Sequence, residues 1–284
     1  MNGEIFKLKK KVFLSIIIII LFLTGCNKDH LLSIHIIDVG QGDSILIQTP
    51  NKKNILVDGG DEDAQHIVKN YLKRKKVKSL DIIIATHPDT DHIGSLDYIV
   101  ENFSVKSIYM PEQSVDSESY INLVNSCNSK KLTPEYLYKG DNISIEKNID
   151  INVLSPSYIQ GDNNLNSIVF TLDFNQNSFL FTGDAEEENE SDIINSFDLD
   201  YVDFLKVGHH GSNSSTTDEF LEETSPDVAA ISCGYKNSYG HPHKQTLENL
   251  SKHSVLTYRT DQIGDIVFFS DGQTIFTKKN YKHQ

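Results

Sequence analysis

The run Asp81-Ile82-Ile83-Ile84-Ala85 leads directly into Thr86-His87-Pro88-Asp89-Thr90-Asp91-His92. A continuous apolar run closed by turn-forming and polar residues predicts a buried strand followed by a turn. Two histidines and two aspartates on such a turn can converge on one point, and imidazoles and carboxylates are ligands for Zn, Mn and Fe. The alternative is a polar turn in which Asp91 caps the next helix. The full string of ligand-type residues favours a metal site.

Three further clusters of ligand-type residues each follow a predicted strand end. Asp184 closes residues 181–184, His209 and His210 lie between glycines in residues 206–212, and His241 lies in residues 239–243. Taken singly, these segments are also typical of a Gly-Asp turn or of solvated loops. Their occurrence together in one chain strengthens the prediction of a metal site.

Outward from these clusters, β-rich runs alternate with amphipathic stretches, and no repeat or long linker is apparent after the first 25 residues. Two halves, each β-rich first and α/β afterwards, predict one layered domain with helices outside two packed sheets. The expected strands are 33–37, 44–48, 54–57, 81–85, 151–154, 168–174, 178–182, 203–207, 229–232, 255–258, 265–269 and 274–277, with weaker fragments at 136–138 and 143–145. The expected helices are 61–75, 95–101, 117–127, 186–196, 218–223 and 245–253.

The N-terminus has the features of an export signal. Four lysines within residues 7–11 precede an apolar run at residues 12–23, which is too short for the roughly 20 residues that a membrane span needs. Leu23-Thr24-Gly25-Cys26 then resembles the lipobox of bacterial lipoproteins. We expect residues 1–25 to be removed, Cys26 to carry lipid, residues 26–32 to form a tether and residues 33–284 to form the domain. The alternative is a plain N-terminal anchor with an incidental cysteine.

The charge balance limits the class of ligand. The 284 residues include 26 Lys and Arg against 40 Asp and Glu, which gives a formal charge of -14. Residues 1–25 contain four lysines and one glutamate, so their removal brings the charge near -17. Binding of duplex DNA mainly by phosphate neutralisation needs clustered Lys and Arg and is disfavoured. A small phosphate-bearing substrate held by a metal remains compatible with this charge.

Cysteine usage excludes a disulfide-dense scaffold, because the chain has only three cysteines. With Cys26 assigned to lipid, Cys127 and Cys233 remain. Their spacing says nothing about their geometry, so a disulfide between them stays open. The favoured state is two separate thiols, with Cys233 buried near a strand end.

Six motifs in order resemble those of the metallo-β-lactamase superfamily: residues 38–44, 58–60, 86–92, 182–184, 208–212 and 240–242. More narrowly, they are similar to the extracellular hydrolase domain of the ComEC-type competence DNA-uptake proteins. The resemblance runs from about Ile34 to Gly272. Because no further hydrophobic span follows residue 25, we expect this hydrolase domain as a stand-alone lipoprotein.

The resemblance implies an α/β fold, an αββα sandwich with the site at one edge of the sheets. It also implies a role for each residue that matches a motif. His87 and Asp89 would bind one metal, Asp91 and His92 the other, Asp184 would bridge them, and His209 would complete the second site. His210 competes with His209 for that role, and the sequence does not separate the adjacent pair.

Two positions depart from the pattern of many relatives. Asp89 stands where they have histidine, and residues 164–167 replace the usual mid-chain histidine, as in the ComEC-type branch. More oxygen ligands favour a harder ion such as Mn. The expected cofactor is therefore one or two divalent ions, Zn or Mn.

The implied chemistry is hydrolysis by a metal-bound hydroxide. Asp91 would orient the nucleophile or accept its proton, and His241 would donate to the leaving group or to a phosphoryl oxygen. Asn166, Ser167 and His210 are the expected substrate contacts. Residues 38–43 are expected to build the turn beneath the site.

Three functions remain open from the sequence. The first is an extracytoplasmic phosphodiesterase, nuclease-like, acting on a small phosphoester or single-stranded DNA, anchored to the membrane by its lipid and without an obligate protein partner. The second keeps the metal site but acts on a cell-envelope phosphoester, lactone or amide. The third is a non-catalytic binding lipoprotein, and the retention of Asp91 and Asp184 argues against it.

Overall fold

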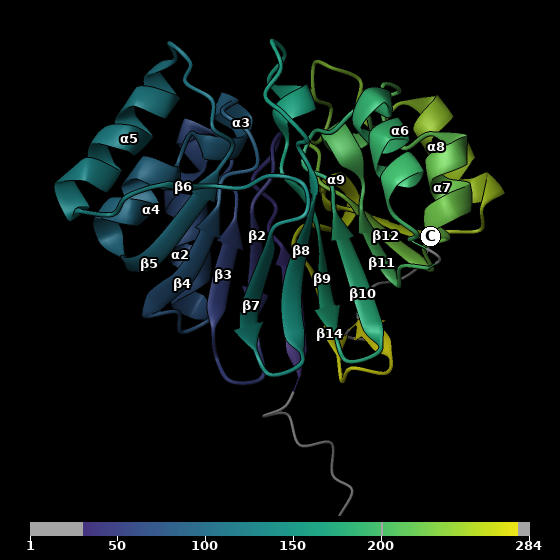
Figure 1. The fold of residues 1–284 in the computed structure, drawn as a ribbon, viewed down its shortest axis with the longest axis horizontal. Coiled ribbons are helices and arrows are strands. Elements are labelled where there is room, and N and C mark those ends of the chain that lie inside the picture. Colours follow the sequence, from purple (N-terminus) through teal and green to yellow (C-terminus); the bar gives the residue numbers. More distant parts are fainter. Residues whose placement is uncertain (1–30, 200, 278–284) are drawn as a thin grey trace, which may run out of the picture.

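Two sheets pack face to face in the computed structural model, which describes residues 31–199 and 201–277 (Figure 1). The first has the order β15-β14-β1-β2-β3-β4-β5-β6 and the second the order β13-β12-β11-β10-β9-β8-β7. The first contains β1 Leu32–Ile36, β2 Ile45–Gln48, β3 Asn54–Val57, β4 Ser79–Ile84, β5 Ser104–Met110, β6 Glu135–Tyr136, β14 Ile266–Ser270 and β15 Ile275–Thr277. The second contains β7 Asn142–Glu146, β8 Ile149–Ser155, β9 Val169–Phe174, β10 Asn177–Phe181, β11 Phe204–Lys206, β12 Val228–Ile231 and β13 Leu256–Arg259.

Helices cover the outer face of each sheet, so the predicted αββα sandwich is confirmed (Figure 1). The first sheet is covered mainly by α2 Gln65–Arg74, α4 Leu96–Asn102 and α5 Glu118–Lys130. The second is covered by α6 Glu187–Ser196, α7 Asp218–Thr224 and α8 Lys244–Lys252. Two short helices, α3 Thr90–Ile93 and α9 Thr260–Ile263, lie in connections.

The core between the sheets explains why they stay together. Phe170 and Phe181 stack at 4.9 Å between ring centroids, and Phe204 meets Phe268 edge-on at 4.9 Å. Burial of apolar area contributes about 25 cal/mol per Å², and aromatic pairs of this geometry add about 1 kcal/mol each. The two sheets therefore form one rigid frame for the loops at their edge.

Each sheet changes from antiparallel to parallel along its width. β1, β2 and β3 are antiparallel neighbours, whereas β3, β4 and β5 are parallel. In the second sheet β8, β9 and β10 are antiparallel, whereas β10, β11 and β12 are parallel. Parallel strands need crossovers through helices, which explains the two α/β halves seen in the sequence.

One strand is absent from the sequence prediction. β5 is residues 104–110, Ser-Val-Lys-Ser-Ile-Tyr-Met, and pairs with β4 over five residue pairs. Its apolar side chains fall on both faces, with Ile108 and Met110 buried on one and Tyr109 partly buried on the other. Neither strict alternation nor a continuous apolar run results, so the pattern that reveals other strands is missing.

Two further sequence predictions concern the cysteines and the N-terminal segment. Cys127 and Cys233 are both free and buried, and they lie in the separate outer cores of the two sheets. The predicted export signal at residues 1–25 and the predicted lipidation site Cys26 lie outside the described residues. Among the described helices, none has the length and apolar character needed to cross a membrane.

Candidate metal centre

Two pairs of parallel strands, one pair in each sheet, end at the same edge of the sandwich. Asp58 directly follows β3, and the predicted metal-binding turn at residues 86–92 follows β4, the parallel neighbour of β3. In the other sheet Asp184 follows β10, and the two histidines at 209 and 210 follow its parallel neighbour β11. The fold thus brings together four segments that are far apart in the sequence.

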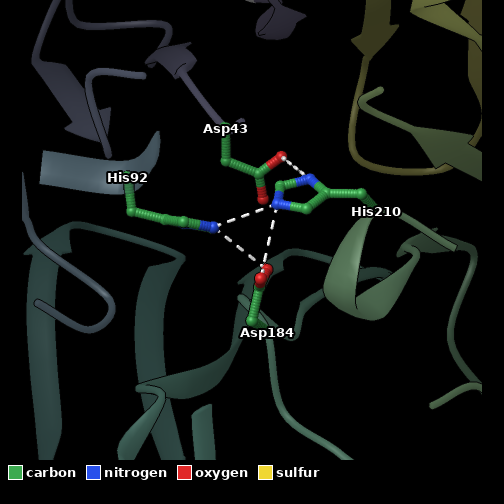
Figure 2. Close-up of side chains that lie close together, drawn as sticks. All are labelled: Asp43, His92, Asp184 and His210. Atoms are coloured by element: carbon green, nitrogen blue, oxygen red, sulfur yellow. Dashed lines mark hydrogen bonds and ion pairs between the residues drawn. The ribbon is translucent and has the colours of Figure 1, made fainter. Parts of the chain in front are cut away.

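Figure 2 shows the centre of this cluster, where ligand-type atoms of Asp43, His92, Asp184 and His210 all lie within 4.8 Å of one another. His92 Nε2 lies 3.1 Å from Asp184 Oδ1, and His210 Nε2 lies 3.3 Å from Asp184 Oδ2. The two Nε2 atoms are 3.2 Å apart. Asp91 Oδ2 lies 3.3 Å from His210 Nε2. Two imidazole nitrogens and two carboxylates therefore converge on one point, with each oxygen of Asp184 facing a different histidine.

The outer nitrogens of both histidines are held by fixed acceptors. His92 Nδ1 lies 2.8 Å from Asp58 Oδ2, and His210 Nδ1 lies 3.0 Å from the carbonyl oxygen of Ser232. A histidine that binds metal commonly donates its other N–H to a carboxylate or carbonyl, which fixes the tautomer and raises ligand basicity. The arrangement leaves both Nε2 atoms free to act as ligands.

Asp58 has a larger role than the sequence showed. Besides facing His92, it accepts hydrogen bonds from Thr86 N at 2.8 Å and Thr86 Oγ1 at 2.7 Å. The carboxylate thereby fixes the start of the metal-binding turn as well as one of its histidines. The only signal in the sequence is an Asp-Gly-Gly segment at a strand end.

Opposite charges dominate the electrostatics of the cluster. Burial alone would lower the pKa of His92, but Asp184 and Asp58 raise it well above its usual value. Burial is likewise overcome for His210, whose pKa Asp184 and Asp91 raise to about 9. Burial would raise the pKa of Asp184, yet His210 and His92 hold it well below its usual range. The carboxylates thus require nearby positive charge, which protons or a metal can supply.

His87 and Asp89 form a second group beside the first. The ring of His87 lies 4.1 Å from that of His92 between centroids, and its Nε2 is 3.7 Å from Asp89 Oδ2. Asn163 Nδ2 donates to Asp89 Oδ1 at 2.6 Å and so holds the carboxylate in place. Asn163 directly precedes the short helical turn at residues 164–166.

The chemistry of these donors fits a divalent metal. His87 Nε2 is buried and has no hydrogen-bond partner among the described residues, and Asp184 Oδ1 is buried with only the ion-pair contact to His92 Nε2. Buried polar atoms are rarely left unpaired, so both atoms are available to a bound metal. Mixed imidazole and carboxylate donors suit Zn and Mn alike. The pairing of His87 with Asp89 and of Asp91 with His92 around two metals, with Asp184 as the bridge, stays a prediction.

The adjacent histidines differ in position. His210 is buried and enters the cluster, whereas His209 Nδ1 lies 3.2 Å from both Ser214 Oγ and Glu186 Oε1. His209 Nε2 lies 3.8 Å from Asp184 Oδ2. Both residues have positive φ, 44° and 54°, and this tight turn sends the two side chains in different directions. The geometry therefore favours His210 as the ligand, opposite to the assignment of His209 to the metal and His210 to substrate.

Two expected substrate contacts are engaged elsewhere. Asn166 is fully buried, with its amide bonded to Gln113 and to the backbone of Gln160. Ser167 Oγ accepts a hydrogen bond from Asp184 N at 3.2 Å. Both side chains support the loops of the site and offer no group to a substrate. The short helical turn at residues 164–166 buries them, which the polar sequence gave no reason to expect.

His241 lies at the rim of the cluster. Its ring centroid is 5.5 Å from that of His209 and 6.2 Å from that of His210. Burial and the neighbouring histidines lower the pKa of His241 to about 4. It is therefore neutral at pH 7, where its ring can donate a hydrogen bond.

Comparison with known proteins identifies the family. A family model described as the metallo-beta-lactamase superfamily matches residues 37–235. The chain belongs to the metallo-beta-lactamase superfamily. This membership and the cluster of donors identify it as a metal-dependent hydrolase.

Similar proteins include competence proteins. ComE operon protein 3 of Bacillus subtilis is 33% identical over 253 residues, which cover 83% of this chain and 32% of that protein. Competence protein ComA of Neisseria gonorrhoeae is 29% identical over 238 residues, which cover 81% of this chain and 31% of that protein. The chain thus spans about a third of the length of these relatives. Among solved structures, the metallo-beta-lactamase fold protein YhfI from Bacillus subtilis has a TM-score of 0.57 at 13% identity, covers 85% of this chain and is itself fully covered, which supports the fold.

A buried ion pair lies beneath the metal centre of this metallo-beta-lactamase fold. Lys206 Nζ lies 2.8 Å from Asp43 Oδ2, and both side chains are at most 2% exposed. The neighbouring Gly42 lets this turn pack against the metal-binding turn, because its φ is +117° and a Cβ there would lie 2.2 Å from the carbonyl oxygen of Asp91. Asp43 Oδ1 is 3.7 Å from His210 Nδ1. The turn at residues 38–43, predicted to underlie the site, thus carries one of its buried charges.

Replacing Lys206 with Met is expected to lower the free energy of unfolding by about 3–5 kcal/mol, because Asp43 would remain as an unpaired buried charge. Urea unfolding of the metal-free protein measures this. Adding Asp43→Asn to Lys206→Met removes the unpaired charge and is expected to recover part of the loss. If Lys206→Met alone were as stable as wild type, the buried charge of Asp43 would not need this lysine.

A second buried carboxylate holds the loop that carries the paired histidines. Glu190 on α6 accepts hydrogen bonds from the backbone N–H groups of Thr216 and Thr217. Burial raises the pKa of Glu190 to about 7, against the lowering effect of these two bonds. The protonated form is thus favoured in the folded chain more than in the unfolded one.

Stability is therefore expected to depend on pH through Glu190. Its contribution is fully present below about pH 4.5 and is lost as the pH rises through about 7, an effect on the order of 3 kcal/mol at 1.36 kcal/mol per pKa unit. Urea unfolding of metal-free protein at pH 5 and pH 8 measures it. Glu190→Gln should flatten this difference, whereas Glu188→Gln on the exposed side of α6 should retain it. Equal pH dependence in both variants would contradict the assignment.

Proposed function

We propose that the chain is an extracytoplasmic phosphodiesterase that cleaves single-stranded nucleic acid, anchored to the membrane through lipid on Cys26. The carrying observation is the loop at residues 234–243, where exposed aromatic rings adjoin the metal centre. The names of two relatives, ComE operon protein 3 and Competence protein ComA, support a role connected with competence. The order of basic residues, short apolar run and Gly25-Cys26 supports the anchor.

The aromatic loop suits nucleobases. Tyr239 and Tyr235, at 64% and 72%, are the most exposed large hydrophobic side chains among the described residues. The ring of Tyr239 stacks on that of His241, with centroids 5.6 Å apart and an interplanar angle of 22°. Exposed aromatic rings bind unpaired bases by stacking, with little regard to sequence. A strand whose phosphate reaches the metal centre would thus have an adjoining base near Tyr239.

The other side of the site disfavours a polyanion. A pocket of about 540 Å³ there is lined by Glu186, Glu187 and Glu188. Glu186 Oε1 also accepts from Asn164 Nδ2 and Ser214 Oγ, which fixes this negative charge at the rim. Like charges repel, so we infer that a strand approaches over residues 234–243 and leaves the α6 side free. Because negative charge bounds this path on the α6 side, we infer that it accepts a single strand rather than a duplex.

The residues of the metal centre and of its rim have different roles in the proposed hydrolysis. A divalent metal held by His92, His210, Asp91 and Asp184, with His87 and Asp89 beside them, would lower the pKa of a water and stabilise charge on the phosphate. Asp91 is 30% exposed, unlike Asp184 at 4%, so it is the carboxylate that can orient a water and accept its proton. His241, neutral at pH 7, can donate a hydrogen bond to a phosphoryl oxygen.

An activity panel tests this function. Mn-loaded and Zn-loaded protein should cleave single-stranded DNA and a small phosphodiester that lacks a base. Tyr239→Leu should raise KM for single-stranded DNA about tenfold, because stacking contributes about 1–3 kcal/mol per base, and should leave the small phosphodiester unaffected. Tyr201→Leu, at the opposite end of β11, is the matched control. Cleavage of lactones or small esters alone would overturn the nucleic-acid assignment in favour of a cell-envelope substrate.

A further inference from the structure

A pocket of about 530 Å³ is rich in lysine. Four lysines line it, together with uncharged residues and the first described residue, Leu31. No Asp or Glu is among its lining residues in the described part of the chain. The lysines are Lys52, Lys75, Lys76 and Lys78, and we refer to them as the basic face.

The basic face lies at the opposite end of the strands from the metal centre. Asn54, which begins β3, and Ser79, which begins β4, both line the pocket. The same two strands end just before Asp58 and the metal-binding turn at residues 86–92 (Figure 1). At about 3.3 Å per residue, strands of this length separate the two ends by about 13–20 Å. The basic face is therefore not part of the catalytic site.

The basic face is positively charged, whereas the net charge of the whole chain is negative. The protein carries 40 acidic against 26 basic residues, yet Lys52, Lys76 and Lys78 are exposed together without an acidic neighbour in the pocket. Among the ion pairs of residues 31–199 and 201–277, none involves these three side chains. The adjacent Lys53 and Arg74 are paired instead, with Asp81 and Asp265. Three exposed lysines without an ion pair therefore lie together on this face.

The chain enters the domain at the same place. Leu31 lines the pocket, and only five residue steps separate it from Cys26. Whatever their path, five residues reach at most about 18 Å. Lipid on Cys26 would therefore hold the pocket within about 18 Å of the bilayer surface. The negative potential of anionic lipids extends about one Debye length, near 10 Å, from that surface.

We propose that the basic face docks on the phosphates of anionic phospholipids and so orients the enzyme on its membrane. The proposal rests on the lipid anchor of the proposed function and is independent of the substrate. An anionic bilayer repels a strongly acidic protein as a whole, whereas the lysines grouped around Leu31 are attracted to it. Docking there turns the metal centre, at the far end of β3 and β4, away from the bilayer and toward the surrounding medium.

Lysine acetylation of the full-length, lipidated protein tests this orientation. The protein is placed in vesicles of phosphatidylcholine alone or with about 30% phosphatidylglycerol, and an uncharged reagent and mass spectrometry report the rate at each lysine. On anionic vesicles Lys52, Lys76 and Lys78 should react at least about threefold more slowly. The exposed Lys130, Lys131 and Lys244 should react at equal rates on both, and high salt should remove the difference.

Charge reversal supplies the matched variants. Lys52→Glu, Lys76→Glu and Lys78→Glu together should abolish protection of the remaining Lys75. The same three changes at Lys130, Lys131 and Lys244 should leave it intact. Both triple variants should hydrolyse a small phosphodiester at the wild-type rate, because neither alters the catalytic end.

Three results would overturn the proposal. The first is equal acetylation of the basic face on neutral and anionic vesicles by protein that floats with them. The second is protection of these lysines by single-stranded DNA but not by anionic lipid, which would assign the face to nucleic acid. The third is a wild-type chain that, like Cys26→Ala, fails to float with vesicles, which removes the anchor. Loss of the phosphodiesterase assignment would leave the acetylation and flotation measurements unchanged.

Discussion

Asp184→Asn is expected to reduce metal-dependent hydrolysis at least about a thousandfold, because the metal supplies several kcal/mol of charge stabilisation and each 1.36 kcal/mol is tenfold in rate. Asp184 faces His92 through one carboxylate oxygen and His210 through the other. The amide keeps the shape but removes the negative charge and turns one oxygen into a donor, which faces an imidazole nitrogen or a metal unfavourably. The predicted metal group therefore loses its central ligand.

Three measurements on the same preparation separate loss of chemistry from loss of fold. The circular dichroism spectrum should stay close to wild type, since Asp184 lies in a loop beyond β10 and takes no part in the three apolar cores. Bound metal should fall, and turnover of a small phosphodiester should fall with it. Asp192→Asn is the matched control, because Asp192 lies on α6 outside the cluster and pairs with Lys139. Full activity of Asp184→Asn would remove Asp184 from the metal group.

The sequence predicts the position of this site because its signals are local. Residues 81–92 contain both a buried strand and its ligand-rich turn, and the strand is present as β4. Asp184 and the histidine pair also follow strands directly. Since the carboxyl ends of parallel neighbours meet at one edge, short patterns are enough to predict that these segments gather.

Side-chain direction and long-range partners are not encoded so locally. Asn166 has the polar character of a substrate contact, but tertiary packing buries it against Gln113 and Gln160. The pairing of Asp43 with Lys206 joins segments more than 160 residues apart, and no pattern in either segment reveals it. The choice between the adjacent histidines depends on two positive φ angles, which a Gly-His-His-Gly sequence permits but does not specify.

The adjacent histidines provide the second large expected effect. His210→Asn should reduce hydrolysis about a hundredfold to a thousandfold, and His209→Asn less than about tenfold. His210 Nε2 lies 3.3 Å from both Asp91 and Asp184, whereas His209 is engaged by Ser214 and Glu186. Asparagine suits this comparison because it tolerates the positive φ of both positions, so backbone strain does not separate the variants.

Kinetics and metal binding together decide which histidine acts as the ligand. Metal affinity, measured by competition with a chelator, should fall for His210→Asn and change little for His209→Asn. Because His210 is buried between acidic groups, its loss should also make Asp184 and Asp91 easier to protonate, so that added metal at high pH restores part of the activity. The opposite ranking of the two variants would return the ligand to His209 and would mean that the turn at residues 208–211 rearranges when metal binds. Equal, small effects would place the second metal position on Asp91, His92 and Asp184 alone.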